Sequence, residues 1–465
     1  MKSLDLTNLS MDSVQQVCET MMTEQGTLSP TVEIQGTCED YVPSLRTLNQ
    51  PDLLQRYEGK EEKYRCFQLH GITAHAQKTD VLKRYIVYLF QNHVLLMFRS
   101  KGKNVWLARS KRSKPVRYER VSLQEKSREV RKVSSLAIRA LYALGWDYGA
   151  VKVVVLPRQK LAVADINPSP PLNEEVGGAF SRAVYRYTQG LPGLAVPLDH
   201  ILMGADPEFI MRRSNGQLVM ASQYFPRFGQ VGCDAIWWGR DRSVKPLVEL
   251  RPKPSMDPRQ LVIRMYQGML YASKKVKDPD IHWLSGSLPH PNYPLGGHIH
   301  FSGIPLTFQL LRALDNYLAL PLVLLEDSKG IKRRPRYGFL GDFRTQFHGG
   351  FEYRTLPSWL ISPTVTKGVL AAAKVIASSY PYLPKDYLKD FSMQKAYYHG
   401  DKTEIKKVLE SLWKDLRSRK EYQQYQEYLD NYYQKLTTGS TWDESRDIRV
   451  AWKIPPYHPL KGGIF

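Results

Sequence analysis

Cysteine is scarce in this chain, and long apolar runs are missing from it. The 465 residues include four cysteines, and no two of them have CxxC spacing. This usage argues against a disulfide framework or a zinc ribbon and is typical of reduced thiols. No run approaches the ~18 apolar residues that a membrane-spanning helix needs, and the first residues show no apolar core of a secretory signal. We therefore expect a cytoplasmic protein without a membrane partner.

Acidic residues are also in short supply. The chain has 66 Lys and Arg against 45 Asp and Glu, a formal net charge of +21. Such an excess favours acidic partners, whether nucleic acid, phosphorylated metabolites or acidic polymers. Because no RRM, KH or helix-turn-helix signature is present, we do not expect nucleic acid, although a polyanion- or nucleic-acid-binding protein stays an alternative. A hydrophobic content of 42% predicts a large core shared by two or three domains.

The N-terminal half is predicted to contain β-hairpins. Apolar runs predict two of them, over residues 85–98 and 151–167, with a helix over 127–144 between them. In the second hairpin Asp165 and Asn167 share a strand face, where their oxygens suit a hard cation.

Two short segments of this half, 143–151 and 164–170, resemble the C-terminal end of an ATP-grasp ligase. In that family a strand-borne carboxylate and an ExN pair hold magnesium on ATP. Asp165 and Asn167 match the pair, with Asp in place of Glu. Lys152 stands where the family keeps its other acidic ligand, and no complete nucleotide-binding half precedes these segments. The resemblance therefore implies an inactive remnant.

The C-terminal half contains a glycine pair followed by two alternating histidines, Gly-Gly-His-Ile-His-Phe-Ser at 296–302. Read as a strand, the segment points His298, His300 and Ser302 to one face. Imidazoles placed in this way suit a metal or an anionic substrate. Alternatively, the two histidines only form hydrogen bonds within a half-buried sheet.

Carboxylates punctuate two other predicted strands. Asp206 and Glu208 are two residues apart, so on a strand both would face one site, although such pairs are common in solvated turns. Glu249 interrupts the apolar run 247–250. It faces either solvent or the interior of a site.

A basic run extends from Lys329 to Arg344 and leads into Glu352-Tyr353-Arg354. Such a run is usually a solvated loop. Here it precedes a strand on which Glu352 and Arg354 share a face, and guanidinium groups bind phosphate oxygens in pairs.

Beyond residue 382 the pattern is helical, and tyrosines recur at three- and four-residue steps, at Tyr422, Tyr425, Tyr428 and Tyr432. This stripe could stack nucleic-acid bases. We expect instead that it packs onto the preceding domain.

Six motifs follow one another between residues 202 and 362: GADPEF, VELRP, GGHIHFS, RYG, DFR and FEYRTLPSW. In this order they resemble the phage-associated amidoligases of COOH·NH2 ligase type 2, which have the glutamine synthetase-like carboxylate–amine ligase fold. The resemblance implies a curved antiparallel sheet around the site with helices outside. The predicted fold is therefore α+β, with an ATP-grasp-like α+β domain before the sheet and a helical segment after it. We expect an N-terminal extension (1–60), the ATP-grasp-like domain (61–198), the catalytic domain (199–381) and the helical segment packed on it (382–465).

The resemblance also implies a role for each matching residue. Metal ligands would be Asp206, Glu208, Glu249, His298 and Glu352. His300 would lie beside the substrate, Arg354 at the transferring phosphate, and Arg336 and Arg344 at the nucleotide phosphates. The catalytic group would comprise Arg354, Glu352, His300 and Arg344. Asp206 stands where many relatives carry Glu.

The implied activity is an ATP- and Mg²⁺-dependent ligase, with two or more Mg²⁺ ions or with Mn²⁺. It would form an amide or peptide bond through an acyl phosphate. The partners would be small-molecule or peptide carboxylates, acidic ones included, and amines. The sequence does not name the substrates or the oligomeric state. A metal-dependent hydrolase or nuclease built on the histidines and acids is a further alternative.

Overall fold

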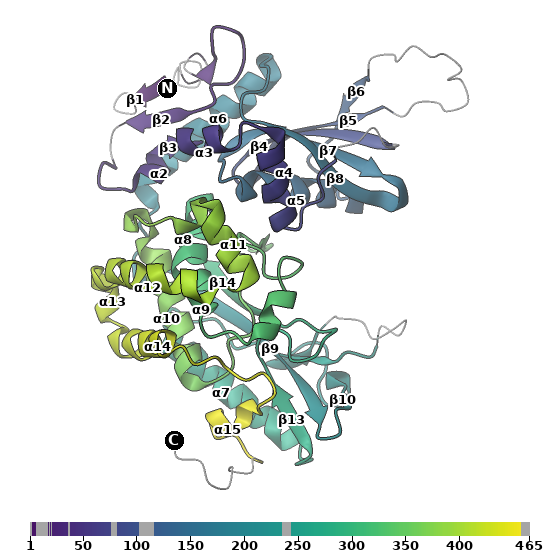
Figure 1. Ribbon diagram of the computed structural model, residues 1–465, viewed down its shortest axis with the longest axis vertical. Coiled ribbons are helices and arrows are strands. Elements are labelled where there is room, and N and C mark those ends of the chain that lie inside the picture. Colours follow the sequence, from purple (N-terminus) through teal and green to yellow (C-terminus); the bar gives the residue numbers. More distant parts are fainter. Residues whose placement is uncertain are drawn as a thin grey trace. The chain divides into compact units, whose positions relative to one another are not determined.

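A computed structural model describes residues 2–5, 17, 19, 21–35, 38–75, 81–101, 116–234 and 243–456. The chain forms two compact units, which Figure 1 shows in the colours of the sequence. The first comprises Met1–Leu194 with Thr307–Gln309, and the second comprises Ala195–Leu306 with Leu310–Phe465. Residues 1–60 therefore share a unit with the ATP-grasp-like segments, and residues 382–465 share one with the amidoligase motifs. The predicted boundary at 198 lies close to the observed division.

The first unit is built on an antiparallel sheet with the strand order β6-β5-β4-β7-β8. Its strands are β4 (Lys83–Phe90), β5 (His93–Ser100), β6 (Tyr118–Arg120), β7 (Tyr148–Leu156) and β8 (Lys160–Asn167). Two helices, α5 (Arg128–Ala143) and α6 (Glu174–Gly190), pack against this sheet. The smaller elements are β1 (Lys2–Asp5), β2 (Val32–Gln35), α2 (Pro43–Arg46), β3 (Thr47–Leu48), α3 (Pro51–Arg56), α4 (Lys60–Leu69), η2 (Pro157–Gln159) and η3 (Leu191–Gly193).

Both predicted hairpins and the helix between them are confirmed. Strands β4 and β5 pair, as do β7 and β8. The Ser127 side chain caps α5 by accepting a hydrogen bond from the Val130 N–H at 3.2 Å. Gly145, just past the helix, has φ +72, the left-handed conformation that glycine adopts without strain.

Both residues of the ExN-like pair already have partners within the protein. Lys152 and Asp165 are cross-strand neighbours, and Nζ of Lys152 lies 3.1 Å from Oδ2 of Asp165. The Asn167 side-chain oxygen accepts a hydrogen bond from the Ser169 N–H at 2.9 Å. Lys152, which stands where the ATP-grasp family keeps an acidic ligand, thus forms an ion pair with Asp165.

The second unit is built on an eight-stranded sheet, in which β11-β12-β9-β14-β16-β15 form a continuous path and β10 and β13 also pair with β9. Its pairs are antiparallel, so the predicted α+β class with an antiparallel sheet is confirmed. The strands are β9 (Leu202–Arg213), β10 (Leu218–Val219), β11 (Val231–Cys233), β12 (Leu247–Leu250), β13 (Ile281–Leu284), β14 (Gly297–Ser302), β15 (Phe343–Thr345) and β16 (Phe351–Tyr353).

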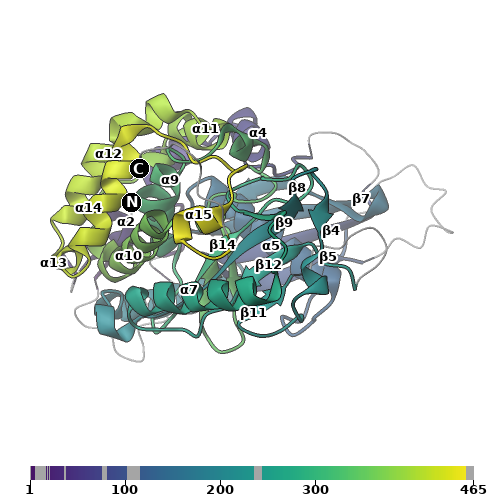
Figure 2. The ribbon, with the colours of Figure 1, turned by 90° about the horizontal axis from the view of Figure 1, so that it is seen from below.

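Helices cover this sheet. In Figure 2 the long helix α7 (Pro258–Lys275) runs beside β11 and β12, and it packs on β9, β11, β12 and α10 (Pro363–Ser379). Its N-cap, Asp257, accepts a hydrogen bond from the Arg259 N–H at 3.0 Å. The remaining helical elements are η4 (Leu198–His200), η5 (Ala221–Gln223), α8 (Phe308–Leu314), η6 (Asp315–Ala319), α9 (Leu320–Leu322), η7 (Ser328–Lys332), η8 (Tyr380–Tyr382), η9 (Tyr387–Lys389), α11 (Phe391–His399), α12 (Lys402–Arg417), α13 (Lys420–Gln423), α14 (Gln426–Thr438) and α15 (Ile448–Trp452).

The tyrosine stripe packs against protein. Tyr422, Tyr425 and Tyr432 are buried, and α14 packs on α10. The Arg259 guanidinium of α7 lies over the Tyr425 ring, 5.1 Å from its centre. The rings of these three tyrosines are therefore not exposed for base stacking. In the described part of the chain, helices are too short or too polar to cross a bilayer.

Candidate functional site

Two neighbouring strands bring the paired acids and the histidines onto one face of the eight-stranded sheet. Antiparallel pairing sets Asp206 of β9 directly opposite His298 of β14, and Gly204 opposite His300. Residues directly opposite each other in such a pair share a face. The predicted alternation of the histidine strand is confirmed.

The outer strands add the later motif residues to the same face. Glu249 of β12 is paired with Glu208, while Glu352 of β16 is paired with His300 and with Arg344 of β15. The sequence leaves open whether Glu249 faces solvent or the site. Its pairing with Glu208 places its carboxylate on the site face.

The opposite face of these strands forms core. Ile299 and Phe301 of β14 and Tyr353 of β16 are fully buried. The Phe301 ring stacks on that of Phe351, with 5.3 Å between their centres. The hydroxyl of Tyr353 donates a hydrogen bond to the Asp315 carboxylate at 2.6 Å. This packing holds the strands that carry the polar residues.

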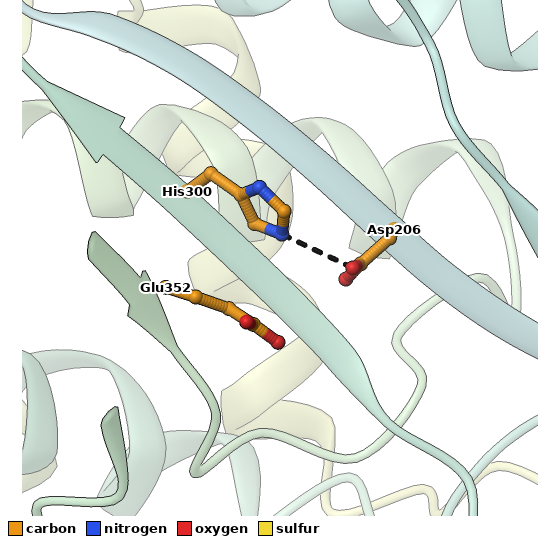
Figure 3. Close-up of side chains that lie close together, drawn as sticks. All are labelled: Asp206, His300 and Glu352. Atoms are coloured by element: carbon orange, nitrogen blue, oxygen red, sulfur yellow. Dashed lines mark hydrogen bonds and ion pairs between the residues drawn. The ribbon is translucent and has the colours of Figure 1, made fainter. Parts of the chain in front are cut away.

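One cluster of ligand-type groups forms around Asp206, as Figure 3 shows. Nε2 of His300 lies 3.1 Å from Oδ2 of Asp206. Nδ1 of His298 lies 3.1 Å from Oδ1 of Asp206 and 3.1 Å from Oε1 of Glu352. One atom each from Asp206, His300 and Glu352 can be chosen so that all three lie within 4.8 Å of one another. The name Asp206 cluster is used below for four residues: Asp206, His298, His300 and Glu352.

A second cluster, which we call the Glu208 cluster, consists of Glu208, Asp234 and Glu249, whose carboxylate oxygens lie within 4.8 Å of one another. Glu208 and Glu249 are buried, and Oε2 of Glu208 accepts a hydrogen bond from the Gly296 N–H at 2.7 Å. Asp234 was not predicted from the sequence. It directly follows Gly232 and Cys233 of β11, and Gly232 is the strand partner of Glu249. This place next to Glu249 is the signal that could have identified Asp234 as a site residue.

Guanidinium groups border both clusters. Arg354 forms an ion pair with Glu352, its neighbour on the same face of β16. Arg344 lies 3.4 Å from the same carboxylate and is largely exposed. The same two-residue spacing recurs at Glu249 of β12, whose carboxyl group accepts a hydrogen bond from the Arg251 guanidinium.

Arg336 is not part of this group. Its side chain is exposed, and its guanidinium lies over the ring of the neighbouring Tyr337 at 5.5 Å. No interaction found among the described residues joins Arg336 to the site carboxylates. Its role at nucleotide phosphates stays a prediction.

The glycine pair lets the histidine strand approach its neighbours closely. A Cβ on Gly296 would lie 2.3 Å from Nε2 of His298, and one on Gly297 would lie 2.4 Å from the Pro357 carbonyl oxygen. Nε1 of Trp359 donates a hydrogen bond to the Gly297 carbonyl at 2.8 Å. Only glycine at these two positions allows the start of β14 to pack this closely against its neighbours.

Gly297→Ala should destabilise the protein by about 2 kcal/mol, because the added methyl group overpacks a site bounded by backbone. Urea denaturation followed by tryptophan fluorescence measures this loss. Gly190→Ala is the matched control, since a Cβ there meets nothing within 4 Å. Equal stability of the two variants would contradict the close approach.

Burial and mutual repulsion set the electrostatics of the carboxylates. Burial would raise the pKa of Asp206, but the two histidines outweigh it and hold that pKa well below its ordinary range. Burial, reinforced by Asp234 and Asp206, raises the pKa of Glu208 to about 7. Burial raises the pKa of Glu249 to about 10. The charges of Asp206 and Asp234 add to this effect, and Arg251 opposes it.

Cation-free protein should therefore lose stability as the pH rises through about 7. A folded-state pKa of about 7 for Glu208, raised from its ordinary value of 4.5, gives a stabilisation that is complete below about pH 4.5. That stabilisation disappears as Glu208 ionises. We expect the melting temperature in EDTA to fall by about 5 °C between about pH 5.5 and about pH 8. Calorimetry on Glu208→Gln should show a shallower fall, and an identical fall would contradict the assignment.

The donor set fits divalent cations. Carboxylate oxygens and an imidazole are ligands that Mg²⁺ and Mn²⁺ accept. Oδ1 of Asp206 is buried, and Nδ1 of His298 lies 3.1 Å from it without hydrogen-bond geometry. The acids within each cluster repel one another, and a cation bound between them would relieve this repulsion.

This sheet face thus has the features of a cation-assisted phosphoryl-transfer site, with acids at its centre and guanidinium groups beside them. Residues 203–454 match the family described as Phage phiEco32-like COOH.NH2 ligase-type 2. Because the match covers more than half of the chain, the chain belongs to this family of carboxylate–amine ligases.

The comparison with solved structures gives a weaker similarity. A crystal structure of a bifunctional glutathione synthetase from Pasteurella multocida is 12% identical and has a TM-score of 0.35. The alignment covers 57% of this chain and 52% of that one, so it spans about half of that chain's length. No curated protein matches the sequence. The resemblance of the N-terminal half to an ATP-grasp site stays a prediction.

Proposed function

We propose that this protein is an ATP- and Mg²⁺-dependent carboxylate–amine ligase that forms an amide or peptide bond through an acyl phosphate. The observation that supports this most is the shared sheet face of Asp206, Glu208, Glu249, His298 and Glu352 beside Arg354. Family membership supports the ligase class. The +21 charge supports an acidic carboxylate donor, such as an acidic peptide.

The first step of the proposed reaction is phosphoryl transfer. An oxygen of the substrate carboxylate attacks the γ-phosphorus of ATP, the bond to the β,γ-bridging oxygen breaks, and ADP leaves. Mg²⁺ held by the Asp206 and Glu208 clusters would neutralise phosphate charge. Arg354, anchored by Glu352, and the more exposed Arg344 would bind the equatorial oxygens of the transferring group.

The second step is attack by the amine on the acyl carbon. The C–N bond forms, the bond to the phosphate oxygen breaks, and inorganic phosphate leaves with one oxygen from the carboxylate. His300 is held at Nε2 by Asp206, which orients the ring beside the substrate. Burial opposes protonation of His300, but Asp206 outweighs it and raises the pKa of the imidazole, which favours a proton-holding role there.

An ADP-release assay over a library of carboxylates and amines tests this proposal. We expect ADP release above background only when a matching acid and a matching amine are both present. ATP consumption at a rate that does not depend on the acid or the amine would leave the ligase proposal unsupported and favour the hydrolase alternative. Asp206→Asn serves as the inactive control.

A single nucleotide site should serve the whole chain. The exposed ion pair of Lys152 with Asp165, which supports an inactive remnant, contributes at most about 1 kcal/mol. Calorimetric titration with a non-hydrolysable ATP analogue should give one site per chain. Lys152→Ala should leave stoichiometry and turnover unchanged. Two sites of unequal affinity would contradict the inactive remnant.

A further inference from the structure

The basic run before β15 contains two adjacent buried arginines with different partners. Arg334 donates from Nη1 to both carboxylate oxygens of Glu326, at 2.9 and 2.7 Å. Arg333 is 3% exposed, and none of the ion pairs found among the described residues includes it. Burial lowers the pKa of Arg333, the expected consequence of a guanidinium kept from water. A buried charge of this kind needs a structural reason.

Arg333 uses both arms of its guanidinium on the chain just beyond Arg354. Nη1 donates to the Thr355 carbonyl at 3.0 Å, and Nη2 donates to the Leu356 carbonyl at 2.9 Å. The Leu356 carbonyl also accepts the Gly297 N–H at 3.2 Å. The Leu356 carbonyl thereby connects Arg333 to the start of β14, and the segment that Arg333 holds directly follows Glu352 and Arg354.

Gly338 makes room for this clamp. A Cβ on Gly338 would lie 1.9 Å from Nη1 of Arg333 and 2.8 Å from the Thr355 carbonyl oxygen, and its φ of +69 also favours glycine. The hydroxyl of Tyr397 donates to the Gly338 carbonyl at 2.8 Å and holds the turn in place. The space that Arg333 needs thus explains the glycine of the RYG motif.

We propose that Arg333 is a positioning residue for the site. By holding the carbonyls of Thr355 and Leu356, it sets the spacing between the β16 strand of Glu352 and the β14 strand of His298. The inference rests on the proposed function for its importance to turnover. Its effect on the cation ligands does not depend on the substrates.

Arg333→Lys tests the clamp, because an ammonium retains the charge but not the planar fork that spans two carbonyls. We expect Mn²⁺ affinity, measured by electron paramagnetic resonance without nucleotide, to weaken ~10-fold or more, as changes behind metal ligands commonly do. Hydrogen exchange at the Gly297 amide should also accelerate. Arg334→Lys is the matched control. It should lower the melting temperature through the loss of the paired contacts with Glu326, yet bind Mn²⁺ like the wild type.

A second variant covers the case in which Arg333→Lys fails to fold. Gly338→Ala keeps the arginine but displaces its Nη1, and we expect the same loss of Mn²⁺ affinity. Wild-type affinity in a folded Arg333→Lys or Gly338→Ala protein would overturn the positioning role. An equal loss in Arg334→Lys would do the same, because it would reduce the effect to general destabilisation. Absence of Mn²⁺ binding in the wild type would instead count against the proposed function itself.

Discussion

Arg354→Lys should melt close to the wild-type temperature while product formation nearly vanishes. The lysine keeps a positive charge next to the buried Glu352, so the folded state loses little. It lacks the fork that grips two phosphate oxygens at once. Loss of a transition-state donor of this kind costs ~10²-fold or more in kcat. Steady-state ADP release and calorimetry on the same preparation measure both quantities.

Arg344→Lys is the matched control for this experiment. Arg344 approaches the same carboxylate at 3.4 Å but is 61% exposed, so its fork is less fixed and we expect a smaller loss of kcat. An Arg354→Lys protein that unfolds would indicate a purely structural ion pair. One that turns over normally would remove Arg354 from the mechanism.

Glu249→Gln should abolish most of the stabilisation by Mg²⁺ without weakening the cation-free protein. Because the pKa of Glu249 is raised to about 10, the cation-free protein holds this carboxyl neutral at neutral pH, and the amide resembles that form. The variant lacks a carboxylate for the cation, so Mg²⁺ affinity should fall ~10-fold or more. The Mg²⁺-induced rise in melting temperature should shrink accordingly, as differential scanning fluorimetry with and without EDTA would show.

Glu444→Gln provides the opposite pattern. Glu444 is 1% exposed and lies outside both clusters. It accepts hydrogen bonds from the Ser287 and Leu288 amides and from the Trp442 indole. We expect this variant to melt lower than the wild type in EDTA while keeping its full response to Mg²⁺. If Glu249→Gln behaved in the same way, Glu249 would be a structural residue and the second cluster would lose its role.

Local periodicity predicted the site residues that lie on regular strands. The alternation around His298 and His300 needs no partner strand to be recognised, and their common face is confirmed. The face of Glu249 depends on which strand lies beside β12, and only the pairing of Glu249 with Glu208 settles it. One strand read alone contains no information about that register.

Two other features depend on packing that sequence patterns do not record. Asp234 follows a strand of three residues, too short for a detectable period. In the basic run, Arg333 and Arg334 are buried whereas Arg336 is exposed. A run of like charges has no periodicity that separates these environments. The phosphate role of Arg336 came from the family resemblance, and no pattern in the sequence indicated Arg333.

Transfer of ¹⁸O from the carboxylate to phosphate tests the central claim most directly. The carboxylate substrate that supports ADP release would carry ¹⁸O at both carboxylate oxygens. It would be incubated with the enzyme, ATP and the matching amine. We predict that each inorganic phosphate released contains one ¹⁸O atom, because the acyl phosphate breaks between the carbonyl carbon and the bridging oxygen. Unlabelled phosphate, or label recovered in AMP, would contradict an acyl-phosphate ligase.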